Sequence, residues 1–170
     1  EKIDAVILTH AHLDHAGMLP VLFKYGYDGP VYCTPPTRDL MLLLQTDYLK
    51  IGGAEGRRAA YDMEDIRTCM RHVIDVDWGQ TVDVAPDIKL TFHNSGHIIG
   101  SSSLHLHVGN GKHNIVFSGD QKYEKSWLFD AASSRFPRCE TLILESTYGG
   151  DGDFQPSREE ANQELQDIVS

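Results

Sequence analysis

The sequence contains few cysteines, no long apolar run and no Gly-rich dinucleotide-binding fingerprint. Its three cysteines, Cys33, Cys69 and Cys139, are odd in number, widely spaced and outside any CxxC motif, which argues against a disulfide framework or a cysteine zinc site. The longest apolar stretch is far short of the roughly 20 residues of a membrane span. The first residues also lack the basic and apolar regions of a signal peptide. We therefore expect a cytoplasmic protein with no membrane contact, and not a Rossmann-type fold.

A cluster of basic residues is also missing. Of the 170 residues, 25 are acidic and 15 are basic, which gives a formal net charge of −10. The acidic excess is even, because residues 1–85 and residues 86–170 each carry a net charge of −5. Surfaces that bind nucleic acid normally concentrate lysine and arginine. The composition therefore speaks against such binding, unless a metal site reverses the local sign of the charge.

The apolar pattern predicts helices early in the chain and strands later. Strands are expected at 3–8 and 31–33, and helices at 16–25, 36–49 and over about ten residues after the cap Asp62. From residue 72 the period changes to two, and strands are expected at 72–76, 81–84, 88–93, 103–108, 115–118 and 138–145. Glycine-rich loops are expected at 51–58 and 149–153, before a terminal helix that Ser157 and Glu160 cap. This order predicts a layered α/β (α+β) fold.

Histidine is the residue that the sequence has in excess. Nine are present, and three of them fall in the segment His10-x-His12-x-Asp14–His15, directly after the first predicted strand. Imidazole nitrogens and carboxylate oxygens are ligands that zinc accepts. The ligand-capable atoms of this short segment outnumber the needs of one tetrahedral ion, and they point to two metals.

This HxHxDH segment resembles the signature of the metallo-β-lactamase superfamily. The resemblance extends to His97 in the segment 95–100 and to Asp120 at the end of a later predicted strand. It implies an αββα sandwich and two Zn²⁺ ions that share one aspartate. The implied ligands of the first ion are His10, His12, His97 and Asp120, and those of the second are Asp14, His15 and Asp120.

A second motif, Glu145–Ser146–Thr147–Tyr148–Gly149, follows an apolar strand. A carboxylate at a strand end can orient a proton donor or a substrate. Together with the histidine motif, this segment resembles the β-CASP nucleases, the branch that includes the endonuclease of the cleavage and polyadenylation specificity factor. The resemblance implies a catalytic role for Glu145, which works there with a histidine of the additional domain. One departure is Gln121, which stands where relatives often have an aromatic residue.

Segments 35–39, 60–65, 122–125 and 135–138 resemble archaeal members of this branch that carry N-terminal KH domains. The resemblance implies that residues 1–150 are a metallo-β-lactamase core segment and that residues 151–170 begin the connection into a β-CASP domain. The opening strands, the β-CASP domain and the C-terminal portion are expected outside this chain. The general-acid histidine and the last ligand of the second metal are expected there too, because residues 146–170 contain no histidine.

The resemblance implies a zinc-dependent ribonuclease that hydrolyses RNA phosphodiester bonds with two metals. Its implied action is endonucleolytic, with 5′-to-3′ exonuclease action as a further activity, in RNA 3′-end formation and transcription termination. Asp14 would both bind metal and orient the attacking hydroxide. The implied partners are single-stranded RNA and RNA polymerase, and the full-length protein is expected to be a homodimer. Because its second metal site lacks a ligand, the isolated segment is expected to be inactive or weakly active.

Three other functions stay open. A small-molecule hydrolase of the same superfamily would not need the segment that begins at Glu145. A catalytically inactive scaffold subunit would not need six ligand-type residues in register. A DNA-directed β-CASP nuclease would generally lack this form of the Glu145 motif, and a cleavage assay with RNA and DNA would distinguish it.

The remaining histidines are expected to be structural. Ser95 and Gly96 make a helix from His93 to His97 unfavourable. His105 and His107 alternate on a strand and share one face, while His72 and His113 occupy ordinary strand or surface positions. The three cysteines are expected to be small buried apolar residues.

Overall fold

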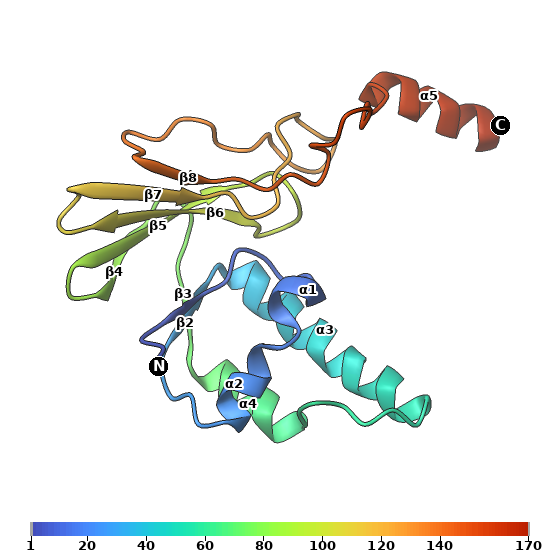
Figure 1. Cartoon of the computed structure of the whole chain (residues 1–170). Helices are drawn as coiled ribbons and strands as arrows, with labels where there is room; N and C mark the ends of the chain where they lie inside the picture. The colour runs from blue at the N-terminus through green and yellow to red at the C-terminus, as the bar shows by residue number, and fades with distance from the viewer. Residues whose placement is uncertain (1, 170) are drawn as a thin grey trace.

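The computed structural model describes residues 2–169 and shows a layer of helices, a small sheet and a larger sheet (Figure 1). Residues 1 and 170, at the ends of the two expected segments, lie outside the described residues. The helices are α1 (Leu13–Ala16), α2 (Leu19–Lys24), α3 (Pro35–Ala54), α4 (Met63–Arg71) and α5 (Arg158–Val169). The strands are β1 (Val6–Ile7), β2 (Val31–Cys33), β3 (Val73–Asp75), β4 (Thr81–Ala85), β5 (Ile88–Asn94), β6 (Ser102–Val108), β7 (His113–Phe117) and β8 (Thr141–Ile143).

The small sheet contains three parallel strands in the order β1-β2-β3. Parallel strands need crossover connections, and here helices supply them. Helices α1–α4 cover one face of the sheet, and Leu8, Phe23, Val31, Met41 and Cys69 are buried in the core between them. The carboxyl end of β1 therefore delivers the histidine-rich segment to a fixed edge of this sheet.

The larger sheet has the order β4-β5-β6-β7-β8, antiparallel except for the parallel pair β7–β8. The turn between β6 and β7 contains Asn110 at φ 58°, the left-handed conformation typical of tight hairpins. Tyr32, Val76, Leu90 and Phe92 are buried in the core between the two sheets. The predicted mixed α/β class is confirmed.

Several predicted boundaries are wrong. The helix expected at 16–25 is shorter, because α1 ends at Ala16 and α2 begins only at Leu19, with Pro20 in its first turn. The helix expected to end near residue 49 continues through Gly52 to Ala54, because the following loop folds back and the Arg57 N–H donates to the Gly52 carbonyl at 2.8 Å. The strands expected at 3–8 and 138–145 extend only over Val6–Ile7 and Thr141–Ile143.

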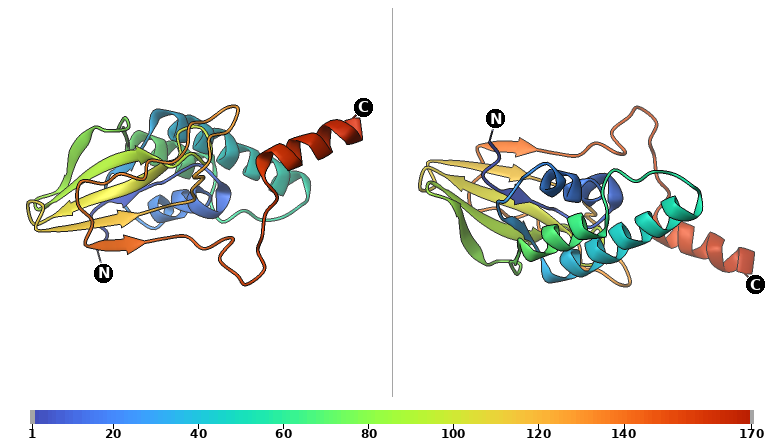
Figure 2. Two further views of the ribbon diagram at one scale, coloured as in Figure 1. Left: turned by 90° about the horizontal axis from the view of Figure 1, so that it is seen from above. Right: turned by 90° about the horizontal axis from the view of Figure 1, so that it is seen from below.

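The capping patterns are confirmed. In α4, the Asp62 carboxylate accepts the Asp65 N–H at 3.1 Å, and Asp65 accepts the Asp62 N–H in return. In α5, Ser157 and Glu160 exchange the same two bonds. Both views of Figure 2 show α5 extending beyond the sheets to the C-terminus. Among the described residues, no helix is long and apolar enough to span a membrane.

Candidate metal centre

Loops from both sheets bring four donor side chains to one point. His10 and His12 follow β1 of the small sheet, His97 lies in the β5–β6 connection, and Asp120 follows β7. One ligand atom from each of the four lies within 4.8 Å of the others. Residues far apart in sequence therefore form one cluster at the edge where the two sheets meet.

The distances within this cluster fit a tetrahedral zinc site. The His12 Nδ1 atom lies 3.2 Å from Nε2 of both His10 and His97. The Asp120 Oδ2 atom lies 3.8 Å from His10 Nε2 and 3.6 Å from His97 Nε2. Zinc–nitrogen bonds of about 2.0–2.1 Å give a tetrahedron with donor–donor edges of about 3.3 Å. The four donors are thus spaced as ligands of a single ion.

The electrostatics of the cluster favour neutral imidazoles. His10 is fully buried, and burial, with the nearby His15, His97 and His12, lowers its pKa to about 3. Burial also lowers the pKa of His97, although Asp120 opposes the shift. A neutral imidazole is the form that binds a metal. The Thr9 hydroxyl lies 3.0 Å from His10 Nδ1, so it can fix the ring that presents Nε2 to the cluster.

Asp14 and His15 stand beside this cluster. The His15 Nε2 atom lies 3.4 Å from the Asp120 Oδ1 atom and 3.4 Å from the Asp14 Oδ2 atom. Asp120 therefore turns one carboxylate oxygen toward the four-donor cluster and the other toward His15. The Asp14 side chain is 78% exposed, so its carboxylate is open to solvent. The structure places all six residues expected to bind metal in one continuous group.

Two glycines let the backbone approach closely enough to form the cluster. Gly119 has φ +56°, and a Cβ there would lie 2.9 Å from the Thr9 Cβ. Gly96 has φ +71°, and a Cβ there would lie 2.6 Å from the Lys122 carbonyl oxygen. Because a side chain at either position would meet both strain and a clash, these positions require glycine.

Glu145 contacts the loop that carries Asp120. Its carboxylate accepts the N–H of Gln121 at 2.9 Å and the N–H of Thr147 at 3.1 Å. Burial acts to raise the pKa of Glu145, but the hydrogen bonds with Thr147 and Gln121 outweigh it, and the pKa is lowered. Glu145 is therefore an anion that holds the residue next to Asp120. Gln121 differs from relatives in the sequence, but its contact with Ser103, whose Oγ accepts from its side-chain amide at 2.9 Å, could not be predicted.

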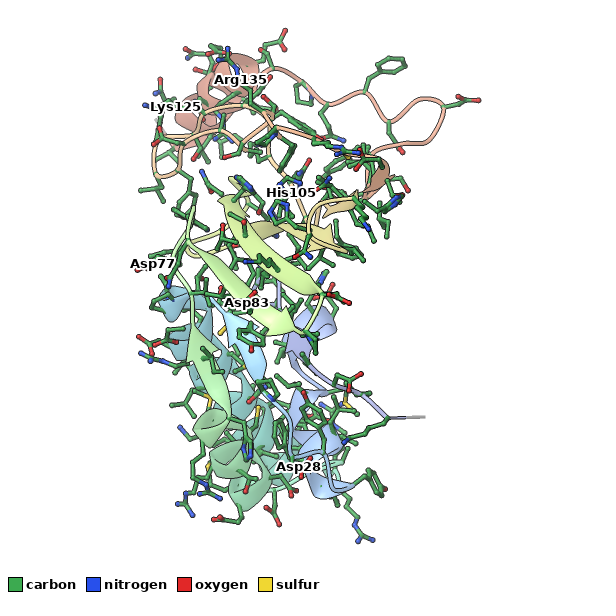
Figure 3. The ribbon with its side chains drawn as sticks, turned by 90° about the vertical axis from the view of Figure 1, so that its left-hand side faces the viewer. Asp28, Asp77, Asp83, His105, Lys125 and Arg135 are labelled. Atoms are coloured by element: carbon green, nitrogen blue, oxygen red, sulfur yellow. The ribbon has the colours of Figure 1, made fainter. Side chains whose placement is uncertain are left out.

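The other histidines lie outside the cluster. His93, His105 and His107 form a stack on the larger sheet, with ring centroids 5.8 Å and 4.1 Å apart in turn. His105 donates from Nε2 to the Arg138 carbonyl at 2.9 Å, and its ring centroid lies 5.6 Å from that of Phe136. Figure 3 shows His105 on the larger sheet. These contacts are structural.

His72 and His113 also make local contacts, with the Thr68 carbonyl and the Thr141 hydroxyl. Cys33 and Cys69 are buried, and burial raises the pKa of each thiol to about 12. The expectation that Cys139 is buried is wrong, because it lies in the exposed segment before β8.

Comparison with known proteins gives a consistent result. Residues 1–139 match the metallo-beta-lactamase superfamily domain. The chain is 56% identical over 168 residues to Transcription termination factor FttA of Methanosarcina mazei, covering 99% of this chain and 26% of that protein. It is 58% identical over 170 residues to the protein of the same name from Methanocaldococcus jannaschii, covering 100% and 27%. The corresponding figures for Thermococcus kodakarensis are 55% over 168 residues, 98% and 26%. The chain thus spans about a quarter of the length of these curated relatives.

Proposed function

Because this chain belongs to the metallo-β-lactamase superfamily and has the partial α/β fold expected of it, we propose that it is the metal-binding part of a zinc-dependent hydrolase that cleaves single-stranded RNA. The observation that carries the proposal is the four-donor cluster at tetrahedral spacing, with the second oxygen of Asp120 turned toward His15. A scaffold protein has no use for this arrangement.

The residues present fit one complete zinc site and part of a second, whose last ligand is expected outside this chain. In this proposal the ligands are His10, His12, His97 and Asp120 for the first ion, and Asp14, His15 and Asp120 for the second. Zinc ions bound there would activate water and polarise the scissile phosphate. Thr9 fixes the His10 ring, and Glu145 holds the Asp120 loop. The exposed Asp14 carboxylate accepts a hydrogen bond from the attacking water.

The biological setting follows the relatives, which are named transcription termination factors. We infer a role in archaeal RNA 3′-end formation and transcription termination in the cytoplasm, with endonucleolytic and 5′-to-3′ exonucleolytic cleavage. RNA polymerase and a second copy of the protein are the proposed partners. Residues 1–150 are proposed as the core segment and residues 151–170 as the start of a connection into a β-CASP domain.

The first test is the metal content of the purified protein, measured by mass spectrometry for wild type, His12→Ala and the control His113→Ala. His113 is exposed and outside the cluster. We expect one to two zinc ions per chain in wild type and the control, and a loss of about one in His12→Ala. A folded wild type that takes up no zinc would overturn the ligand assignment.

The second test compares cleavage of labelled single-stranded RNA, single-stranded DNA and a β-lactam by the zinc-loaded protein, with Asp120→Asn as the inactive control. We expect at most weak cleavage of RNA, because the last ligand of the second metal is expected outside this chain, and no cleavage of DNA or of the β-lactam. Preferential cleavage of DNA or of the β-lactam would favour one of the other hydrolase functions, and an identical RNA rate in Asp120→Asn would point to a contaminating nuclease.

A further inference from the structure

A cavity lies directly beside the metal centre and uses none of its proposed ligands except His97. It has a volume of about 300 Å³ and is lined by His97, Lys122, Trp127, Phe129 and Arg158. A second cavity, of about 540 Å³, shares Lys122 and Arg158 with the first. The two cations therefore stand where the cavities join, next to the loop that carries a proposed metal ligand.

Lys122 and Arg158 are among the basic residues of this acidic chain that have no ion-pair partner within residues 2–169. Seven others form ion pairs: Arg38, Arg57, Arg67, Arg71, Lys89, Lys125 and Arg138. Within residues 2–169, neither Lys122 nor Arg158 has an ion pair or a side-chain hydrogen bond. The Nε atom of Arg158 is shielded from solvent and has no acceptor. An unsatisfied buried donor costs free energy, so a ligand that brings an acceptor here would be favoured. The nearest acid in the lining is Glu124, which is exposed and pairs with neither cation.

Backbone contacts fix Lys122 relative to the metal centre. Its N–H donates to the Ser95 carbonyl at 2.9 Å, and its own carbonyl accepts the Ala132 N–H at 2.8 Å. Ser95 lies two residues before His97, in the same loop. Lys122 is also two residues after Asp120. The lysine is thus attached at both sides to segments that carry proposed ligands.

Aromatic surface completes the lining. Trp127 is 80% exposed in the first cavity, and Tyr148 is 68% exposed in the second. Figure 3 shows Lys125 and Arg135 at this same end of the molecule, whereas Asp28 lies at the opposite end. Exposed aromatic rings beside cations are the combination by which proteins bind single-stranded nucleic acid, since rings stack on bases while cations hold the backbone.

We propose that Lys122 and Arg158 bind a backbone phosphate of single-stranded RNA beside the metal centre, with Trp127 stacking on a neighbouring base. The identity of the strand as substrate rests on the function proposed above. Guanidinium and ammonium groups both bind phosphate, the former through paired N–H donors. In a chain with a net charge of −10, two unpaired cations beside the reaction centre give a local attraction for a polyanion.

The test is binding of a fluorescently labelled ten-nucleotide RNA to the metal-free protein, which cannot cleave it, followed by fluorescence anisotropy over a range of salt concentrations. The variants are Lys122→Gln, Arg158→Gln and Trp127→Ala, and the control is Lys112→Gln, which removes an exposed lysine on the β6–β7 turn. We expect a loss of about tenfold in affinity for each cation variant. Each should also lower the salt slope by about 0.7, the value for one phosphate contact on a single strand. Lys122→Arg should restore binding.

Three results would overturn the proposal. The first is equal affinity in Lys122→Gln, Arg158→Gln and the control. The second is that inorganic phosphate or a mononucleotide binds as tightly as the RNA, which would make this a site for a free phosphate. The third is that an acidic decapeptide of glutamate binds equally well, which would indicate a protein partner.

Failure of the phosphate-site proposal can be distinguished from failure of the proposed hydrolase function. If RNA binding depends on Lys122 and Arg158 but the zinc-loaded protein cleaves no RNA, the phosphate site stands and the hydrolase function fails. If the double variant Lys122→Gln/Arg158→Gln cleaves RNA with an unchanged KM, the hydrolase function stands and the phosphate site fails.

Discussion

Asp120 shows how a single side chain determines the character of the site. Its Oδ2 faces two imidazoles of the four-donor cluster, and its Oδ1 faces His15. A carboxylate can bridge in this way because each oxygen carries its own lone pairs, whereas an imidazole ring offers one nitrogen to a given ion. This geometry supports the proposal that Asp120 is shared between two ions.

The close approach of the backbone at Gly96 should make a side chain at this position lower both the stability of the protein and its affinity for zinc. Gly96→Ala would force a Cβ to within 2.6 Å of the Lys122 carbonyl at a positive φ. Gly111→Ala is the matched control, because Gly111 has φ +80° but nothing within 4 Å of such a Cβ. The free energy of unfolding of the control should fall by about 1–2 kcal/mol from strain alone. That of Gly96→Ala should fall further, and its zinc binding should be weaker. Urea denaturation and zinc titration measure both, and equal losses in the two variants would contradict the clash.

The carboxylate of Glu145 is expected to act through the loop that it holds. Glu145→Gln keeps the size of the side chain but replaces one acceptor oxygen with a donor NH₂, so one of the two N–H groups, of Gln121 or of Thr147, loses its acceptor. Zinc affinity should fall by about 10- to 100-fold, the usual cost of losing a group that orients a ligand. Competition with a chelator measures it. The control Glu124→Gln changes an exposed residue and should leave the zinc affinity unchanged. An unchanged zinc affinity in Glu145→Gln would mean that Glu145 has no positioning role.

At the scale of elements, the sequence alone predicts helices, caps and strands correctly where the residues that determine them lie close together in the chain. The capping boxes of α4 and α5 are defined by residues three apart, such as Asp62 and Asp65, and both form. The alternation of β4–β7 predicted those strands to within about two residues. The HxHxDH motif pointed to a cluster of side chains because it directly follows a predicted strand, and the structure brings His10 and His12 together there.

Features that depend on distant contacts could not be predicted. Helix α3 continues through Gly52 because the Arg57 loop folds back on it, which local propensity opposes. The pairing of Lys122 with the Ser95 carbonyl joins segments that are far apart in sequence, and nothing in either segment signals it. The burial of Cys139 was overestimated because its type, not its surroundings, suggested a core position.

The N-terminal cap of helix α4 is expected to stabilise the folded protein measurably. Asp62→Ala removes the acceptor of the Glu64 and Asp65 N–H groups, and the free energy of unfolding should fall by about 0.5–2 kcal/mol. The control Glu64→Ala removes only exposed ion pairs with Arg67 and Arg71, worth about 0–1 kcal/mol. Urea denaturation compares the two. A smaller loss in Asp62→Ala than in Glu64→Ala would contradict the capping role.

At the scale of the whole molecule, the histidine stack makes folding sensitive to pH. Burial, and next the nearby His107, lower the pKa values of His93 and His105 in the folded protein. In the unfolded chain these groups have a pKa of about 6.5. Below that pH the unfolded chain therefore binds protons that the folded protein does not, and the free energy of unfolding falls with falling pH until the lowered folded pKa values are reached.

His105→Gln should reduce this pH dependence, because it removes one titrating ring and keeps a donor for the Arg138 carbonyl. Urea denaturation of the metal-free protein between pH 7.5 and pH 5.5, with His113→Gln as the control, measures the slope. The control should match wild type, since His113 is exposed and its ring bonds to the Thr141 hydroxyl. A slope in His105→Gln as steep as that of wild type would assign the pH dependence to other groups.

The metal centre joins the two sheets, so metal binding should stabilise the molecule as a whole. His10 and His12 follow a strand of the small sheet, whereas His97 and Asp120 follow strands of the larger one. A ligand that binds only the folded state adds about 2.7 kcal/mol of stability at a concentration 100 times its Kd. Saturating zinc should therefore raise the thermal midpoint of wild type, and chelation should reverse the rise. It should also slow hydrogen exchange at the Ser102 N–H, which bonds to the Thr9 carbonyl at 2.8 Å across the sheets. In His97→Ala both effects should disappear, while His113→Ala should keep them. An undiminished zinc effect in His97→Ala would mean that the ion binds within one sheet and does not hold the two together.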